Sequence, residues 1–195
     1  MQRKTSFALA GLALALSACG HMGMAGGMSS PDPMTQTKMV GGAPMYPSKD
    51  IVDNAVNSKD HTTLVAAVKA AGLVDTLKGP GPYTVFAPTN GAFSQLPAGT
   101  VDTLLKPENK PMLVKVLTYH VVPGRIDAAA LAQQIRAGGG RAMLKTASGG
   151  TLTATLRGSD VVIEDAKGHG AVVTTSDVYQ SNGVIHVVDH VLLPG

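Results

Sequence analysis

The six histidines have the most versatile side chains in this 195-residue sequence, because imidazole binds metal ions and acts as a general base. His186 and His190 would share one face of a strand, separated by about 13 Å, which is too far for one mononuclear metal site. Asp189 precedes His190, but neighbouring strand residues point to opposite faces, so we expect no oriented carboxylate–histidine pair. The sequence contains no HExxH motif, no cysteine pair and no GxSxG elbow. We therefore expect a protein that is not an enzyme, with no catalytic residues, metal ion or cofactor.

Cys19 is the only cysteine, so no disulfide can form within the chain. Arg3 and Lys4 are followed by an apolar stretch, residues 7–16, that is too short to span a bilayer, and then by Leu-Ser-Ala-Cys. This arrangement resembles a bacterial lipoprotein signal peptide, which implies cleavage after residue 18 and lipid attachment to Cys19. The alternative is an ordinary secretory signal, which would yield a soluble secreted protein.

The composition of residues 19–47 changes to Gly, Met, Ser, Pro and Thr without periodicity, which is typical of a flexible tether. Its methionine thioethers could ligate cuprous ion, but their irregular spacing and single histidine favour a spacer. We expect a signal peptide at 1–18, a tether at 19–47 and one domain at 48–195. The residue after Cys19 is Gly20, whereas an aspartate at this position resembles a signal for retention in the inner membrane. We therefore expect the protein in the outer membrane, on either its periplasmic or its outer side.

The charge of the chain does not indicate a nucleic-acid partner. The formal net charge is +3, and removal of the signal peptide with Arg3 and Lys4 leaves 14 basic against 13 acidic residues. A net charge this close to zero does not indicate the positively charged surface that binding of nucleic acid requires. The sequence is 44% hydrophobic but only 4% aromatic, so the core must be aliphatic.

Helical periodicity comes early in the domain and period-two alternation comes late. The first expected helix covers residues 50–57 and is capped by Ser48, and the second runs from Thr62 or Thr63 to Gly72. A third covers residues 101–106 and is capped by Thr100, and a fourth has Pro111 in its first turn. The last runs from Asp127 to Arg136. The expected late strands are 142–146, 151–156, 161–164 and 171–175. This segregation predicts an α+β fold with N-terminal helices packed against an antiparallel β-sandwich-like core.

The run YTVFAPTNGAF, residues 83–93, predicts a strand that feeds a helix. The strand begins at Tyr83 and stops at Pro88, and Thr89 or Asn90 is placed to cap a helix that buries Phe93. We expect this strand to join the late strands, giving pairing between segments far apart in the sequence.

The run NGVIHVVDHVLLPG, residues 182–195, predicts a strand that follows a turn. Asn182 and Gly183 form a turn dipeptide that tolerates positive φ. The apolar residues after them alternate on both faces, so we expect a central strand covered on both sides. Asp189 lies on this apolar strand and must be hydrogen-bonded, most simply to secure a turn or a helix end.

The two runs and the Tyr119-His120 pair between them resemble the fasciclin-like domain family. That family carries TVFAPTNxAF, then a Tyr-His pair, then NGxxHxxDxVLLP, and the resemblance covers roughly residues 48–195 in family order. It implies a fasciclin-like fold and an adhesion function. Within the motifs, we expect a structural role for six residues: Thr89, Asn90, Asn182, Gly183, His186 and Asp189. Departures are Gly91, where a larger polar residue is frequent, and His190, where an arginine is frequent.

Tyr119 and His120 have two interpretations. The structural one buries the histidine where a helix ends, with its ring satisfying backbone carbonyls, and buries the tyrosine ring while its hydroxyl stays near water or a partner. The functional one comes from the family, in which the Tyr-His region is implicated in adhesion to receptors. Leu117, Val121 and Val122 mark a core environment, which favours the structural interpretation.

We therefore expect a lipid-anchored adhesion module whose partner is a protein or carbohydrate at a surface or matrix. The alternative is a carrier of an apolar small ligand such as a lipid or pigment, because some members of the fasciclin-like family resemble pigment or lipid binders. A hydrophobic groove would favour that alternative. A periplasmic enzyme would require a polar cluster assembled from distant parts of the chain.

Overall fold

The structure, a computed structural model, describes residues 32–195. Cys19, the expected signal peptide at 1–18 and the first part of the expected tether lie outside the described residues. A short 3-10 helix, Pro33–Thr35, precedes a hairpin of β1, Lys38–Val40, and β2, Ala43–Met45. The expectation of a flexible tether up to residue 47 is wrong for this hairpin, whose inner residues Val40, Ala43 and Met45 are buried. Its Gly41-Gly42 turn, with both φ values positive, suits a two-residue hairpin.

Three of the seven α-helices within residues 32–195 begin where a side chain accepts a hydrogen bond from a free backbone N–H group. Asp50, Thr89 and Asp127 each accept a bond from the backbone three residues on, so Asp50 and not Ser48 caps the first helix. None of the helices within residues 32–195 is long and apolar enough to cross a membrane. The helices are α1 Ile51–Ala55, α2 Thr62–Ala71, α3 Val74–Lys78, α4 Asn90–Ser94, α5 Thr100–Leu105, α6 Lys110–Tyr119 and α7 Ala128–Ala137, with 3-10 turns at Lys59–His61 and Pro107–Asn109.

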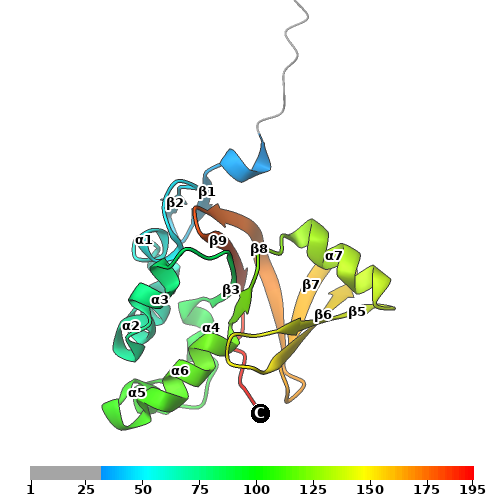
Figure 1. The fold of residues 1–195 in the computed structure, drawn as a ribbon. Helices are drawn as coiled ribbons and strands as arrows, with labels where there is room; N and C mark the ends of the chain where they lie inside the picture. Colours follow the sequence, from blue (N-terminus) through cyan, green and yellow to red (C-terminus); the bar gives the residue numbers. More distant parts are fainter. Residues whose placement is uncertain (1–31) are drawn as a thin grey trace, which may run out of the picture. The chain divides into compact units, whose positions relative to one another are not determined.

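One mixed sheet replaces the expected antiparallel β-sandwich. Its order is β4-β3-β9-β8-β7-β6-β5, and β3 pairs with β9 in parallel while the other pairs are antiparallel. Helix α7 is the helix expected from Asp127 to Arg136, and it lies between β4 and β5 (Figure 1). The parallel pair explains the difference, because long connections carrying helices must separate its two strands. The strands are β3 Tyr83–Pro88, β4 Val121–Pro123, β5 Arg141–Lys145, β6 Thr151–Arg157, β7 Asp160–Glu164, β8 Gly170–Gln180 and β9 Gly183–Val188.

Strand β9 separates two apolar cores, and all six of its residues are buried. The prediction of a central strand covered on both faces is confirmed. Ile185 and Val187 face one core and Val188 faces the other, because alternate strand side chains point to opposite faces. We call the first the helical core, which includes Val52, Leu64, Leu77, Val85, Leu117, Ile185 and Val187. We call the second the sheet core, which includes Phe86, Tyr119, Leu131, Ile135, Leu152, Ile163 and Val188.

The two cores are covered by different helices. Helices α1 to α6 lie on one flank of the central strands, whereas α7 covers the strands β5 to β7 on the other (Figure 1). The predicted pairing of strand 83–86 with a late strand is confirmed, because Tyr83 pairs with Gly183 and Val85 with Ile185. The two motif-bearing runs thus meet as neighbouring strands at the boundary between the cores.

Candidate functional site

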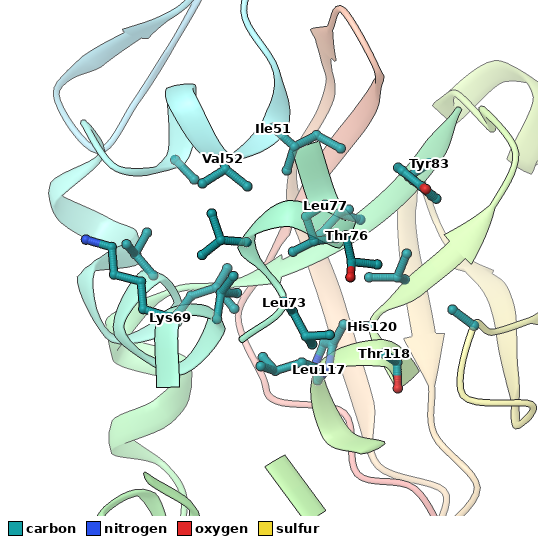
Figure 2. A pocket seen from close by; sticks show the side chains of 18 of the residues that line it. Ile51, Val52, Lys69, Leu73, Thr76, Leu77, Tyr83, Leu117, Thr118 and His120 are labelled. Atoms are coloured by element: carbon teal, nitrogen blue, oxygen red, sulfur yellow. The ribbon is translucent and has the colours of Figure 1, made fainter. Parts of the chain in front are cut away.

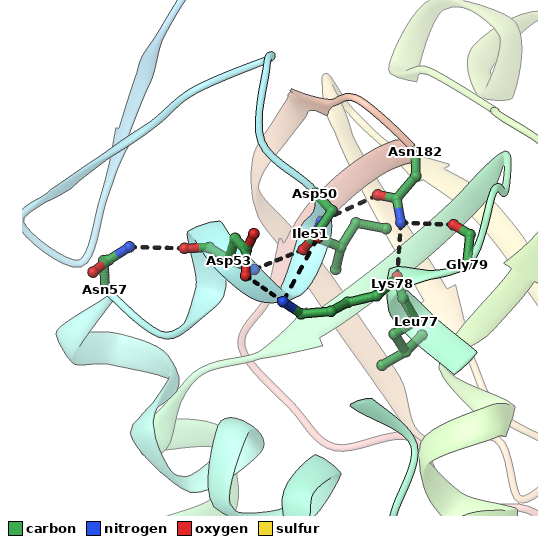
Figure 3. Close-up of polar contacts among 8 residues, drawn as sticks. All are labelled: Asp50, Ile51, Asp53, Asn57, Leu77, Lys78, Gly79 and Asn182. Carbon is green, nitrogen blue, oxygen red and sulfur yellow. Dashed lines mark hydrogen bonds and ion pairs between the residues drawn. The ribbon is translucent and has the colours of Figure 1, made fainter. Parts of the chain in front are cut away.

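Asn182 joins three segments of the chain at the edge of the helical core. Its side-chain amide donates hydrogen bonds to the carbonyl oxygens of Leu77 and Gly79, at 2.7 and 3.1 Å, and its Oδ1 accepts one from the backbone N–H of Ile51 at 3.1 Å (Figure 3). Asn182 is only 8% exposed, so these bonds are made away from water. The residue therefore holds the start of α1 and the end of α3 against β9.

Gly183 is needed for close packing of two backbones. Neither Asn182 nor Gly183 has a positive φ, so the expectation based on that backbone freedom is wrong. A Cβ at Gly183 would instead overlap the carbonyl oxygen of Tyr83 on the parallel neighbour β3. Glycine permits this approach because it has no side chain.

Thr89 and Asn90 perform two separate structural tasks. The Thr89 hydroxyl accepts the capping bond from the N–H of Ala92 at 3.3 Å. Asn90 uses its Oδ1 to accept from the N–H of Thr63 at 3.0 Å, and its side-chain amide donates to the carbonyl of Lys59 at 2.8 Å. Thr89 therefore caps α4, whereas Asn90 fastens α4 to the start of α2.

Tyr119 lies inside the sheet core with only 1% of its surface exposed. Its hydroxyl donates to the carbonyl of Thr151 at 2.8 Å and accepts from the N–H of Ala166 at 3.0 Å. Burial raises the pKa of this hydroxyl. The expectation that the hydroxyl lies near water or a partner is wrong, because two backbone groups use it. A Cβ at Gly150 would lie 2.6 Å from the ring, so the ring also requires a glycine beside it.

His120 is 3% exposed and bonds two distant backbone segments. Its Nδ1 donates to the carbonyl of Val116 at 2.8 Å, and its Nε2 accepts from the N–H of Leu192 at 3.0 Å. The ring is therefore neutral, and burial lowers its pKa to about 4. The structural interpretation of the Tyr-His pair fits this geometry. Direct partner contact by Tyr119 and His120 does not, because neither side chain reaches the surface.

His186 and Asp189 also bond backbone groups. His186, stacked on Phe86 with ring centroids 5.6 Å apart, donates from Nε2 to the carbonyl of Ile126 at 2.8 Å. Burial lowers its pKa. Asp189 Oδ1 accepts from the N–H of Val172 at 2.7 Å, which fits the expectation that this carboxylate is hydrogen-bonded, although Asp189 is only half-buried.

The expectation of no contact between Asp189 and His190 is wrong. The Nδ1 of His190 donates to Asp189 Oδ1 at 2.8 Å. Strand β9 ends at Val188, so the alternation of side chains no longer applies to the two residues beyond it. The carboxylate serves the backbone of β8 as well, and no nucleophile is among its hydrogen-bond partners.

An apolar cavity of about 90 Å³ lies in the helical core. It is partly enclosed, and its wall is almost entirely apolar. Figure 2 shows Ile51 of α1, Leu73 and Leu77 around α3, and Leu117 of α6 around this space. Sequence reasoning missed the cavity because its wall combines side chains from four helices and two strands, and no local pattern reports how well such elements fit.

The remaining polar groups of residues 32–195 include one buried serine–histidine pair. Within residues 32–195, no group of three or more His, Cys, Asp or Glu side chains could hold a metal ion. Ser58 Oγ lies 2.9 Å from Nδ1 of His61, and both residues are buried. Burial lowers the pKa of His61. The apolar cavity is therefore the candidate functional site, and its chemistry is the binding of an apolar group.

Comparison with known proteins agrees with this fold. Protein sll1483 of Synechocystis is 51% identical over 144 residues, which cover 74% of this chain and 73% of that protein. The cell surface glycolipoprotein MPB83 of Mycobacterium bovis is 36% identical over 149 residues, covering 72% of this chain and 58% of that protein. A solved FAS1 domain pair from the insect cell adhesion molecule fasciclin I shares the fold, with a TM-score of 0.68 and 17% identity over 76% of this chain and 52% of that chain.

The Fasciclin domain matches residues 59–194, which include β3, the Tyr-His pair and β9. This chain belongs to the fasciclin domain family.

Proposed function

We propose that this chain is an exported, non-catalytic interaction module of the cell envelope. A lipid on Cys19 anchors it, a short flexible segment follows, and the fasciclin domain binds a protein or carbohydrate partner. The observation that supports this most is membership of the fasciclin family, together with the similarity to a cell surface glycolipoprotein. The Leu-Ser-Ala-Cys junction supports the anchor.

The hairpin shortens the proposed tether. If residues 19–32, which precede the short 3-10 helix, behave as a flexible coil, their root-mean-square reach is about 20 Å. Such a spacer lifts the domain clear of lipid headgroups, which suits binding to a neighbouring surface.

The anchor is tested by changing its attachment residue. Cys19→Ser should shift the protein from the membrane fraction to the soluble fraction, or leave it unprocessed with its signal peptide. Met22→Ser is the control, because it changes the same segment outside the proposed attachment site. Membrane retention of a fully processed Cys19→Ser protein would contradict the proposal.

The interaction function is tested by deletion of the gene in the native host. The deletion strain should attach less to surfaces or to neighbouring cells, and the wild-type chain supplied in trans should restore attachment. Normal attachment by the deletion strain would overturn the adhesion proposal.

The cavity favours a second candidate, a carrier of a small apolar ligand. A space of about 90 Å³ would hold the end of a chain and not a whole lipid or pigment. Protein purified from the native host and measured by native mass spectrometry should then carry a stoichiometric apolar molecule. A mass equal to that of the protein alone would count against the carrier.

A further inference from the structure

Strand β5 forms one edge of the seven-stranded sheet, because within residues 32–195 it pairs only with β6. The N–H of Thr146 donates to the carbonyl of Gly150 at 2.9 Å, directly after the last strand pair, Lys145 with Thr151. Bonded and non-bonded pairs alternate along antiparallel strands. Met143 therefore belongs to a non-bonded pair, and its N–H and carbonyl point away from β6. Within residues 32–195, no turn, loop or side-chain hydrogen bond uses either group.

The open part of this edge is short and centred on Met143. At its start, the carbonyl of Arg141 lies against Gly138, where a Cβ would overlap it. Beyond its far end, the N–H of Ala147 donates to the carbonyl of Val121 on β4 at 2.7 Å, so the two edges of the sheet meet there. Between these closures the Met143 side chain is 78% exposed, more than any other large apolar side chain within residues 32–195. An exposed strand edge is a template for one further strand.

Two cations flank Met143 on the same face of β5. Arg141 and Lys145 alternate with buried residues, and both side chains are exposed. The three residues opposite this row on β6 are all threonine, so the neighbouring strand supplies no carboxylate. Within residues 32–195 no ion pair includes Arg141 or Lys145, whereas Glu164 on β7 pairs with Arg157. We call Arg141, Met143 and Lys145 the β5 row.

The charges of the β5 row distinguish between possible added strands. A second copy pairing antiparallel about Met143 would set Arg141 of each copy against Lys145 of the other, and like charges directly opposite destabilise a strand pair. A strand with Asp or Glu at both positions would instead gain two attractive pairs. Its middle residue would exchange two hydrogen bonds with the N–H and carbonyl of Met143. An apolar side chain on that residue would cover the exposed methionine.

A shallow groove beside β5 has room for the side chains on the other face of such a strand. It has a volume of about 600 Å³, and Gln134 and Ala137 of α7 line it together with Ala142 of β5. Helix α7 covers this face of the sheet (Figure 1). Small uncharged residues suit these positions, because alanines and one amide form this part of the wall.

We propose that the β5 edge binds an extended acidic segment of the protein partner as an added strand, in which two Asp or Glu residues flank one apolar residue. The inference rests on the proposed interaction function and adds the site and the chemistry of the partner. The main-chain groups of Met143 recognise an extended polypeptide, because it supplies both a donor and an acceptor. The two cations of the β5 row favour acidic segments over basic ones.

The first test measures peptide binding to the full-length protein by NMR. The probe is acetyl-Thr-Glu-Thr-Val-Thr-Glu-Thr-amide, and the control is the same peptide with an N-methyl group on valine, which removes the donor for the Met143 carbonyl. The amide signals of Met143 and Lys145 should shift and saturate with the probe, and N-methylation should weaken binding about tenfold. Absent shifts, or equal affinities for the two peptides, would overturn the proposal.

A proline substitution tests the backbone contact from the side of the protein. Met143→Pro removes only an outward N–H, which an edge strand tolerates, and should weaken binding about tenfold. Met143→Thr is the matched control, because it also removes the methionine side chain but keeps the N–H, and should stay within about threefold of the wild type. Circular dichroism checks that both variants are folded. Equal affinities of the two folded variants would contradict strand addition.

A charge exchange tests the choice of partner and does not depend on the proline variant. The double variant Arg141→Glu/Lys145→Glu should lose the acidic probe and bind acetyl-Thr-Lys-Thr-Val-Thr-Lys-Thr-amide instead, each by about tenfold. Lys106→Glu/Lys110→Glu makes the same change in net charge at two exposed residues outside β5, and should bind like the wild type. Unchanged preference in the first variant would reject the role of the β5 row. A dimer that Met143→Pro abolishes would assign the edge to a second copy and overturn the acidic partner.

A cell-level experiment separates this inference from the function on which it rests. A deletion strain that attaches normally would overturn the interaction function and this inference together. If the deletion strain loses attachment while the folded Met143→Pro protein restores it fully, only the role of the β5 edge fails. Attachment restored by Met143→Thr but not by Met143→Pro supports the edge as the partner site.

Discussion

The two cores on either side of β9 are held in different ways. In the sheet core, Tyr119 makes two buried hydrogen bonds to backbone groups of other strands and loops. In the helical core, short helices pack apolar side chains around a cavity of about 90 Å³, with smaller ones of about 30 and 10 Å³ beside it. Asn182 holds the edge of the helical core but does not fill it.

The sheet core therefore contributes mainly to stability, whereas the helical core contains the space in which a ligand could bind. Directional bonds to fixed backbone atoms allow one arrangement of the sheet core, because an unpaired buried group would cost about 1–3 kcal/mol. Apolar contacts among several short helices are not directional, and imperfect fit leaves empty volume. The motif residues that could be taken for a binding site therefore stabilise the domain, whereas the least conspicuous residues of the helices form the space that can accept a ligand.

Gly183→Ala should have the largest effect, because it disturbs the boundary of both cores. The new Cβ would overlap the Tyr83 carbonyl, and the parallel strands would have to separate. We expect a loss of more than about 4 kcal/mol in the free energy of unfolding, or no folded protein, measured by urea denaturation. Gly91→Ala is the control, because the nearest atom to its Cβ would be at 3.6 Å, and its effect should stay within about 1 kcal/mol. A Gly183→Ala protein as stable as Gly91→Ala would show that the strands are not in this contact.

Acid should destabilise the domain through its buried histidines, and the effect should come next in size. The pKa of His120 is lowered to about 4 when folded, whereas the unfolded chain takes up this proton at about 6.5. Its contribution is complete above pH 6.5 and is lost as the pH falls towards 4, by about 3 kcal/mol. Urea titrations from pH 7.5 to 4 should show this decline, and His120→Gln should reduce its slope. A slope unchanged in that variant would count against the role of His120.

Tyr119→Phe should have an intermediate effect on stability and none on partner binding. The ring stays, but the Thr151 carbonyl and the Ala166 N–H lose their shared hydroxyl. We expect a loss of about 2 kcal/mol on urea denaturation. Folded variant protein should attach to surfaces as the wild type does. Unchanged stability combined with lost attachment would reverse our interpretation and assign the hydroxyl to partner recognition.

A matched pair of valine substitutions should show the smallest and most specific difference. Val65 lines the cavity, whereas Val188 is fully buried in the sheet core. Val65→Ile should change stability by less than about 0.5 kcal/mol, since the added methyl enters empty space, while Val188→Ile should cost about 1–2 kcal/mol through overpacking. Thermal denaturation of both variants measures the contrast. Equal losses would mean that the two cores are packed alike.

Local chemistry explains which elements could be predicted. Asp127 and Thr89 cap helices as expected because the residues that cap a helix lie three positions from the groups they bond. The twofold alternation from Gly183 to Val188 likewise lies in one short segment. The hairpin at residues 38–45 was missed because each of its strands has only three residues, too few for alternation to stand out in a stretch rich in glycine and methionine.

The sequence by itself determined the two motif-bearing strands, their capped neighbours, the aliphatic character of the core and the family resemblance, because each depends on nearby residues. Only the tertiary structure decided that β3 and β9 run in parallel, that the Tyr119 hydroxyl is used by the backbone and that His190 reaches Asp189. It alone placed the cavity among α1, α2, α3 and α6. These features depend on how distant segments fit together, and packing between distant segments has no signature in the spacing of residues along the chain.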